Sequence, residues 1–258
     1  MLDQKKFNEL KSYFDNYTKR FYNNEDDQKA IDLKYHHSYR VYENINKLAN
    51  NIGLAEKEIV IANVIGLFHD LGRFEQYKKY KTFSDSISIN HAELSVEILK
   101  EKNIFHNLNK GSQNIIYQAI LHHNKIDIPE NLSEEELLFS KLIRDADKLD
   151  IWNIFAERYH RQENNDKINL NLTEEGIISP EILQLILEEK TVKYSSLKTI
   201  DDFKIVQMGW IYNLNFKESF IIVKKRQYIE KIYHSIKSKE AKKVFDNINE
   251  YMYKKISD

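Results

Sequence analysis

Apolar residues recur at three- and four-residue steps along most of the chain. Between residues 3 and 22, Phe7, Leu10, Phe14, Tyr17 and Phe21 follow this spacing. The spacing places them on one face of an amphipathic helix. The same pattern predicts two further helices that end near residue 50 and at residue 69. Four more begin near residues 88–90, 111, 133 and 180. The last three cover about 203–215, 217–236 and 239–255. The chain is therefore predicted to be all-α.

Three polar stretches interrupt this pattern. The first, at residues 23–27, is a break followed by the acidic first turn of the next helix. The second is a predicted loop with one short helix at 73–88, and the third is the longest predicted loop, at 162–177. None of them reads as a linker between domains, and no internal repeat is visible. We therefore expect one all-helical domain over residues 1–258.

Composition supports the helical prediction and narrows the class of protein. Six glycines and two prolines are few for 258 residues, and a chain rich in turns would need more of them. The formal net charge of −1 gives no general electrostatic reason to expect a nucleic acid or a membrane as partner. The start of the chain has no apolar signal-peptide segment, and no apolar run is long enough to cross a bilayer. We therefore expect a cytoplasmic protein.

The chain contains no cysteine. Disulfide bonds and thiolate metal sites are thereby excluded, so any metal ion must be bound through nitrogen and oxygen atoms.

Histidine and aspartate residues interrupt several apolar helical stretches, where an unpartnered polar group would be costly. The clearest case is the pair His69-Asp70, which ends an apolar helix and is followed by Gly72. The other candidates are His37, His91, His123 and Asp147, with His122 as a weaker one. One such histidine alone is usually a hydrogen-bonded core residue. Six imidazole and carboxylate groups together favour a site for one or two divalent metal ions.

Three cations lie within four residues of these candidates. They are Arg40, Arg73 and Lys148, and we expect them to bind phosphate oxygens or to stabilise charge that develops there. Asp70 is the expected bridge between two metal ions, because a carboxylate has two oxygens to share.

Three ordered segments carry a resemblance to a known family. They are His37-Ser38-Tyr39-Arg40-Val41, Phe68-His69-Asp70-Leu71-Gly72, and Arg144-Asp145-Ala146-Asp147-Lys148-Leu149-Asp150. Together they resemble the HD-domain superfamily, in which a histidine, a His-Asp pair and an aspartate bind metal within a helical bundle. The resemblance implies an HD-like core over about residues 30–155, followed by a helical C-terminal extension over about 156–258. His91 and His123 match the extra histidines of two-metal members.

The resemblance implies a metal-dependent phosphohydrolase that acts on a nucleotide or another phosphate ester through a metal-activated hydroxide. Mn, Fe, Co, Ni and Zn are all compatible with the ligand set. The expected partner is a small phosphorylated substrate, and a homodimer is left open. The segments that mark cyclic-di-GMP phosphodiesterases, guanosine-tetraphosphate hydrolases and deoxynucleoside triphosphohydrolases are missing, so the subfamily stays open. Two alternatives also stay open: a di-iron oxygenase of the same superfamily, and a non-catalytic nucleotide sensor or interaction protein with a structural metal.

Overall fold

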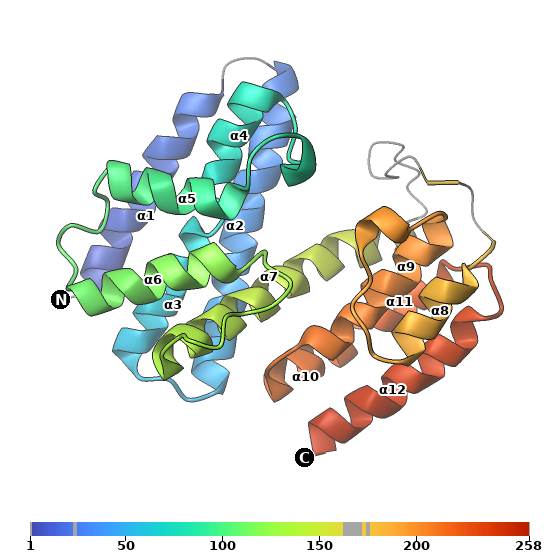
Figure 1. The fold of residues 1–258 in the computed structure, drawn as a ribbon. Coiled ribbons are helices and arrows are strands. Elements are labelled where there is room, and N and C mark those ends of the chain that lie inside the picture. The colour runs from blue at the N-terminus through green and yellow to red at the C-terminus, as the bar shows by residue number, and fades with distance from the viewer. Residues whose placement is uncertain (1, 23–24, 162–171, 174–175, 258) are drawn as a thin grey trace. The chain divides into compact units, whose positions relative to one another are not determined.

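A computed structural model describes residues 2–22, 25–161, 172–173 and 176–257 (Figure 1). Within these ranges the chain is helical and contains no strand, apart from an isolated bridge between Thr173 and Thr199. The predicted all-α fold is thereby confirmed. The break predicted at residues 23–24 and most of the loop predicted at 162–177 lie outside the described residues. No helix among the described residues is long and apolar enough to cross a membrane.

Two compact units make up the chain, Met1–Asp150 and Ile151–Asp258. The first contains α1 (Gln4–Thr18), α2 (Glu25–Asn51), α3 (Glu56–Phe68), α4 (Gly72–Tyr80), α5 (His91–Glu101), α6 (Lys110–His122) and most of α7 (Glu134–His160). Helix α7 runs through the boundary between the units. Because the HD-like core was expected to end near residue 155, its predicted end lies close to this boundary. The expectation of a single domain stays a prediction.

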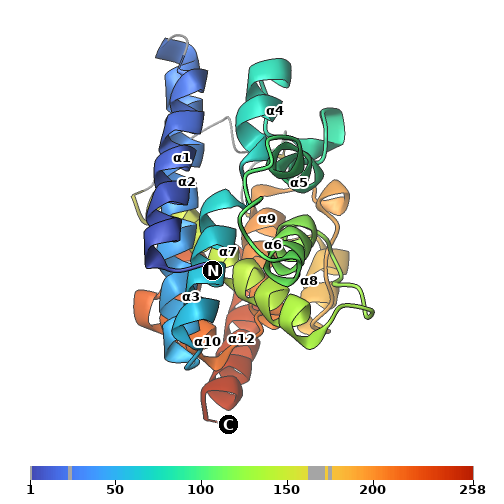
Figure 2. The same ribbon diagram turned by 90° about the vertical axis from the view of Figure 1, so that its left-hand side faces the viewer.

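The first unit is built around α3, which is buried along most of its length. It packs closely against α2, because Gly66 leaves no side chain between them: a Cβ atom there would lie 2.6 Å from Ile45 Cγ2 and 2.9 Å from Tyr42 Cα. Helix α1 lies along α2 through aromatic contacts of Phe14 with Tyr35 and Tyr39 (Figure 2). This packing fixes the end of α3, where the His69-Asp70 pair follows.

Side-chain caps define where other helices of this unit begin. The Asn90 side chain accepts hydrogen bonds from the first-turn backbone of α5, and Asn109 does the same for α6. At the start of α7, the Ser133 backbone N–H donates to Glu136 Oε2 at 2.9 Å, and the Glu136 N–H donates to Ser133 Oγ at 3.3 Å. This is the reciprocal arrangement of a capping box.

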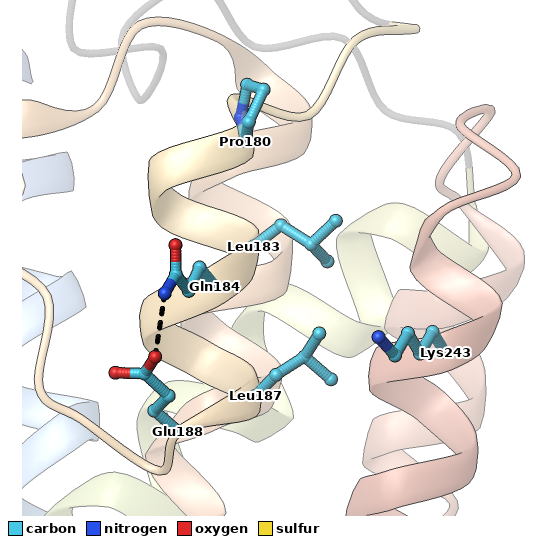
Figure 3. Close-up of a pocket in the computed structure, with 6 residues that line it drawn as sticks. All are labelled: Pro180, Leu183, Gln184, Leu187, Glu188 and Lys243. Atoms are coloured by element: carbon cyan, nitrogen blue, oxygen red, sulfur yellow. Dashed lines mark hydrogen bonds between the residues drawn. The ribbon is translucent and has the colours of Figure 1, made fainter.

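The second unit holds the rest of α7 and α8 (Pro180–Leu187), α9 (Ile200–Gly209), α10 (Lys217–Arg226), α11 (Tyr228–His234) and α12 (Ala241–Ser257). Its core includes Trp152, whose indole N–H donates to the Gln207 carbonyl oxygen at 2.8 Å. On its surface, Leu183 and Leu187 of α8 point toward Lys243 of α12 and line a pocket (Figure 3).

The structure agrees with one of these segments and corrects another. The short helix predicted within 73–88 is α4, in which Phe74 and Gln76 are buried. The single helix predicted over 217–236 is two helices, α10 and α11. They are separated at Gln227, which has φ of 55°, in the left-handed region that ends a helix.

Candidate metal centre

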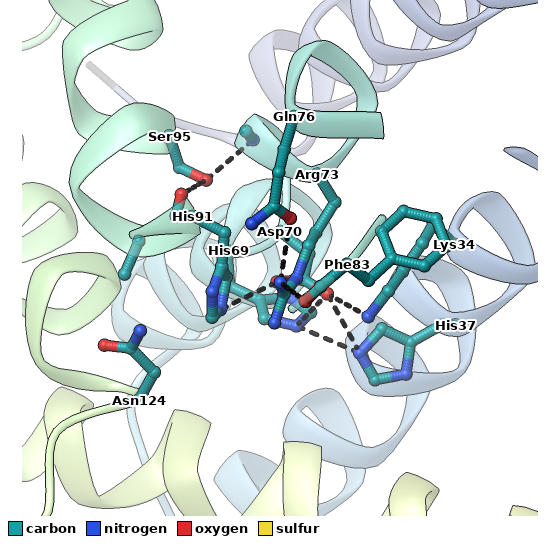
Figure 4. A network of polar contacts seen from close by, with 12 residues as sticks. Lys34, His37, His69, Asp70, Arg73, Gln76, Phe83, His91, Ser95 and Asn124 are labelled. Carbon is teal, nitrogen blue, oxygen red and sulfur yellow. Dashed lines mark hydrogen bonds and ion pairs between the residues drawn. The ribbon is translucent and has the colours of Figure 1, made fainter. Parts of the chain in front are cut away.

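The six predicted ligands come from five helices or helix ends of the first unit. They are His37 within α2, His69 and Asp70 after α3, His91 at the first position of α5, His123 after α6, and Asp147 within α7. Figure 4 shows how several of these side chains converge. The ligand atoms form three overlapping groups, each with its atoms within 4.8 Å of one another: His37-His69-Asp70, His69-His123-Asp147 and Asp70-His91-His123.

A backbone contact brings two of these segments together. The Gly72 N–H donates to Ser95 Oγ at 2.7 Å, and the Ser95 hydroxyl donates to the His91 carbonyl oxygen at 2.8 Å. The start of α4 is thereby fixed against the first turn of α5. Asp70, two residues before Gly72, consequently lies beside His91.

Asp70 occupies the middle of the centre, and its two oxygens face different histidines. Its Oδ2 lies 3.5 Å from His37 Nε2 and 3.8 Å from His69 Nε2. Its Oδ1 lies 3.3 Å from His91 Nε2 and 3.8 Å from His123 Nε2. The carboxylate therefore stands between two pairs of imidazoles, as a bridging ligand would.

Asp147 adds a second carboxylate on one side. Its Oδ1 lies 3.2 Å from His37 Nε2 and 3.8 Å from His69 Nε2. This oxygen is buried and has no well-aligned hydrogen-bond donor. Such a buried acceptor needs a partner, and a bound cation would supply one.

All four histidines turn the same nitrogen toward the centre. Each Nδ1 faces an oxygen acceptor instead: Asp150 Oδ2 for His37 (2.7 Å), the Gly66 carbonyl for His69 (2.8 Å), Asp85 Oδ2 for His91 (2.6 Å) and the Ile120 carbonyl for His123 (2.6 Å). A proton on Nδ1 satisfies each acceptor and leaves Nε2 with a free lone pair. The tautomers that a metal ion requires are thus set by the protein.

The Nε2 atoms lie close together. His37 and His69 approach to 3.2 Å, and His91 and His123 approach to 3.0 Å. Ligand atoms bound about 2.0–2.2 Å from one divalent ion lie about 3.0–3.5 Å from each other. The spacing, the lone pairs and the unpartnered carboxylate oxygen all fit a divalent metal ion.

Burial shapes the charges of these groups. It lowers the pKa of His69 to about 3 and that of His91 to about 4, so both imidazoles are neutral. For His37, burial also acts to lower the pKa, but the Asp147 and Asp150 carboxylates outweigh it and raise the pKa overall. Burial acts to raise the pKa of Asp70, yet Lys34 and the histidines hold it well below its usual value. A metal ion held by His37 would compete with a proton for its Nε2 lone pair.

Arg40 and Arg73, which the sequence suggests as phosphate-binding groups, contact the carboxylates that orient two ligands. Arg40 Nε donates to Asp150 Oδ1 at 2.6 Å, and Asp150 contacts His37. On the other side of the centre, Arg73 Nη1 donates to Asp85 Oδ1 at 2.8 Å, and Asp85 contacts His91. Each half of the centre thus has an arginine, an aspartate and a histidine in series. Asp85 is not among the predicted site residues, because its polar, irregular segment carries no periodic signal.

The remaining candidates differ in position. Lys148 is half-buried, and burial together with Arg144 lowers its pKa; the described residues show no hydrogen bond to its amine. The His122 ring contacts Gln118 Oε1 at 3.0 Å and does not join the cluster. Lys34, which is not among the predicted site residues, places its Nζ 2.8 Å from Asp70 Oδ2. The sequence could have indicated Lys34 as a site residue, because it lies one turn before His37 on the apolar side of α2.

Comparisons with known proteins agree with this geometry. A family model described as the HD domain matches residues 35–152, a range that includes all six candidate ligands. No curated protein and no solved structure matches the chain. Members of the matched family are mostly metal-dependent hydrolases. Residues 35–152 therefore form an HD domain.

Proposed function

We propose that this protein is a metal-dependent phosphohydrolase with a two-metal centre, and that its substrate is a nucleotide or another small phosphate ester. The observation that carries the proposal is the position of Asp70, with one oxygen toward His37 and His69 and the other toward His91 and His123. A shared carboxylate between two pairs of imidazoles suits two adjacent divalent ions.

Each residue has a defined part in this proposal. His37, His69 and Asp147 would hold one ion, His91 and His123 the other, and Asp70 both. Ions bound there would act as Lewis acids toward phosphoryl oxygens and would lower the pKa of coordinated water. Asp150 and Asp85 keep the Nδ1 protons of His37 and His91 in place, so that their Nε2 atoms stay available.

Substrate access is proposed on the side of Asp147. Its side chain is 19% exposed, whereas those of His69 and Asp70 are at most 3% exposed. Lys148 follows Asp147 on the same helix and is half-buried. Its amine is suited to contact a phosphate oxygen that enters there.

Metal analysis followed by an activity screen tests the proposal. The protein is purified without added metal, its metal content is measured by mass spectrometry, and samples loaded with Mn, Fe, Co, Ni or Zn are given phosphomonoesters, phosphodiesters and nucleotides. We expect about two ions per chain and hydrolysis that the Asp70→Ala variant lacks.

Other outcomes contradict the proposal in different ways. Two bound ions without hydrolysis of any phosphate ester would refute it, and substrate-dependent oxygen uptake by the iron-loaded protein would favour an oxygenase. A single tightly bound ion with no turnover would favour the non-catalytic alternative.

A further inference from the structure

A lysine amine lies within the metal centre itself. Lys34 precedes His37 by one turn of α2, and its Nζ donates to Asp70 Oδ2 at 2.8 Å (Figure 4). The same Nζ lies 5.4 Å from the centre of the Phe83 ring, close enough for a cation–π contact. The Lys34 side chain is 17% exposed, so water reaches only part of it.

The hydrogen bonds of the arginines near the centre go to other groups. Arg40 donates to Asp150, and Arg73 Nη1 donates to Asp85 and Gln76. Arg73 Nε also lies 3.6 Å from Asp70 Oδ1, the oxygen that faces away from Lys34. Among the described residues, by contrast, the one hydrogen-bond acceptor of the Lys34 ammonium is Asp70 Oδ2, an oxygen that the proposed metal centre also needs.

Metal binding would therefore change the surroundings of Lys34. A carboxylate oxygen that binds a divalent ion has less negative charge to offer, and the ion repels the ammonium group. A mostly buried ammonium without an acceptor is costly. An anion at the centre removes that cost, and a phosphate group matches the compact charge and three donors of a lysine.

We propose that Lys34 is a phosphate-binding residue of this centre: it is paired with Asp70 before metal binds, and it donates to an oxygen of a bound phosphate afterwards. The Phe83 ring holds the ammonium near the centre in both states. The identity of the anion rests on the proposed function, but the binding step can be measured without turnover.

Titration with inorganic phosphate tests this role. Metal-loaded wild type, Lys34→Met, Lys34→Arg and the control Lys47→Met are compared by calorimetry. Lys47 is an exposed lysine on the same helix. We expect Lys34→Met to weaken phosphate binding by about tenfold or more, the value of a charge-assisted hydrogen bond. Lys34→Arg should retain much of the affinity, and Lys47→Met should match wild type. Phosphate binding that is equal in Lys34→Met and wild type would overturn the proposal.

Metal binding provides the second measurement. Lys34→Met should bind as many ions as wild type, and at least as tightly, because the competing ammonium is gone. If metal content falls instead, Lys34 serves the metal ligands, and its proposed role is wrong. Lys34→Gln replaces Lys34→Met in both titrations if the latter does not fold.

The two proposals fail separately. Lys34-dependent phosphate binding without hydrolysis of any ester would contradict the phosphohydrolase and support the role of Lys34. Metal-dependent hydrolysis with equal phosphate affinity and equal KM in wild type and Lys34→Met would do the reverse.

Discussion

Asp85 and Asp150 each contact one histidine of the centre, so changing them should weaken metal binding at the two proposed positions one at a time. Asp85 contacts His91 at 2.6 Å, and Asp150 contacts His37 at 2.7 Å. We expect Asp85→Asn to lower the affinity for a metal ion at His91. Asp150→Asn should lower the affinity for a metal ion at His37.

The size of the effect follows from the donors around Asp85. Its Oδ2 faces His91 Nδ1 and Asn124 Nδ2 (3.3 Å), and its Oδ1 accepts from Arg73 Nη1 (2.8 Å) and Gln76 Nε2 (2.9 Å). An asparagine amide replaces one of these acceptors with a donor, so in either orientation its NH₂ group faces other donors. Loss of such a partner costs about 10- to 100-fold in metal affinity, which is about 1.4–2.7 kcal/mol.

Competition with a chromophoric chelator measures both affinities, and mass spectrometry gives the number of ions per chain. His91→Ala serves as the reference for complete loss of a ligand. Asp127→Asn, at an exposed carboxylate in the loop after α6, is the control for a change of charge. We expect Asp85→Asn to keep one ion at wild-type affinity and to hold the other more weakly.

Two results would refute this reasoning. Wild-type affinity for both ions in Asp85→Asn would show that the contact with His91 has no influence on metal binding. Weakening of the same ion by Asp85→Asn and Asp150→Asn would show that the centre does not divide at Asp70.

Three further predictions concern the same unit. Asp70→Ala should bring the metal content toward zero, because both halves lose a ligand; unchanged metal content would exclude the bridging role. In Gly72→Ala the new Cβ would lie 2.5 Å from the His91 carbonyl oxygen and 2.7 Å from the Ser95 nitrogen. Because such overpacking costs about 1–3 kcal/mol, the Tm should fall by about 2–10 °C in a thermal melt. The metal-free protein should lose stability as the pH falls from 6.5 toward 4, because burial lowers the pKa of His69 to about 3 and that of His91 to about 4. Over that range the unfolded chain takes up protons that the folded protein excludes. Denaturant titrations with chelator at several pH values measure the free energy of unfolding. A free energy that does not change with pH would contradict this prediction.

The ligand cluster was predictable because each member stands where a pattern is clear. His37, His69 and Asp147 interrupt or end stretches of regular apolar spacing, and a buried titratable group in such a stretch calls for a partner. His123 rather than His122 joins the cluster because it immediately follows the last helical residue of α6, and its Nδ1 reaches back to the Ile120 carbonyl oxygen.

The contacts around the ligands were not predictable in the same way. Arg40 and Arg73 could be placed near the centre from their spacing, but the acceptors they contact depend on how Asp150 and Asp85 are brought in by other segments. The break at Gln227 also has no local signal, because its left-handed backbone occurs at a residue other than glycine.

The arrangement of the ligands also determines how a bound metal would act on the chain as a polymer. His37 and His69 are 32 residues apart, as are His91 and His123, and the chain has no cysteine with which to join distant segments. Ions held at these positions would close several long loops at once. When a disulfide closes one loop of this length, the lower entropy of the unfolded chain stabilises the folded state by about 3–4 kcal/mol at 25 °C. Metal depletion would then remove several cross-links in one step and expose the backbone of the first unit to proteases.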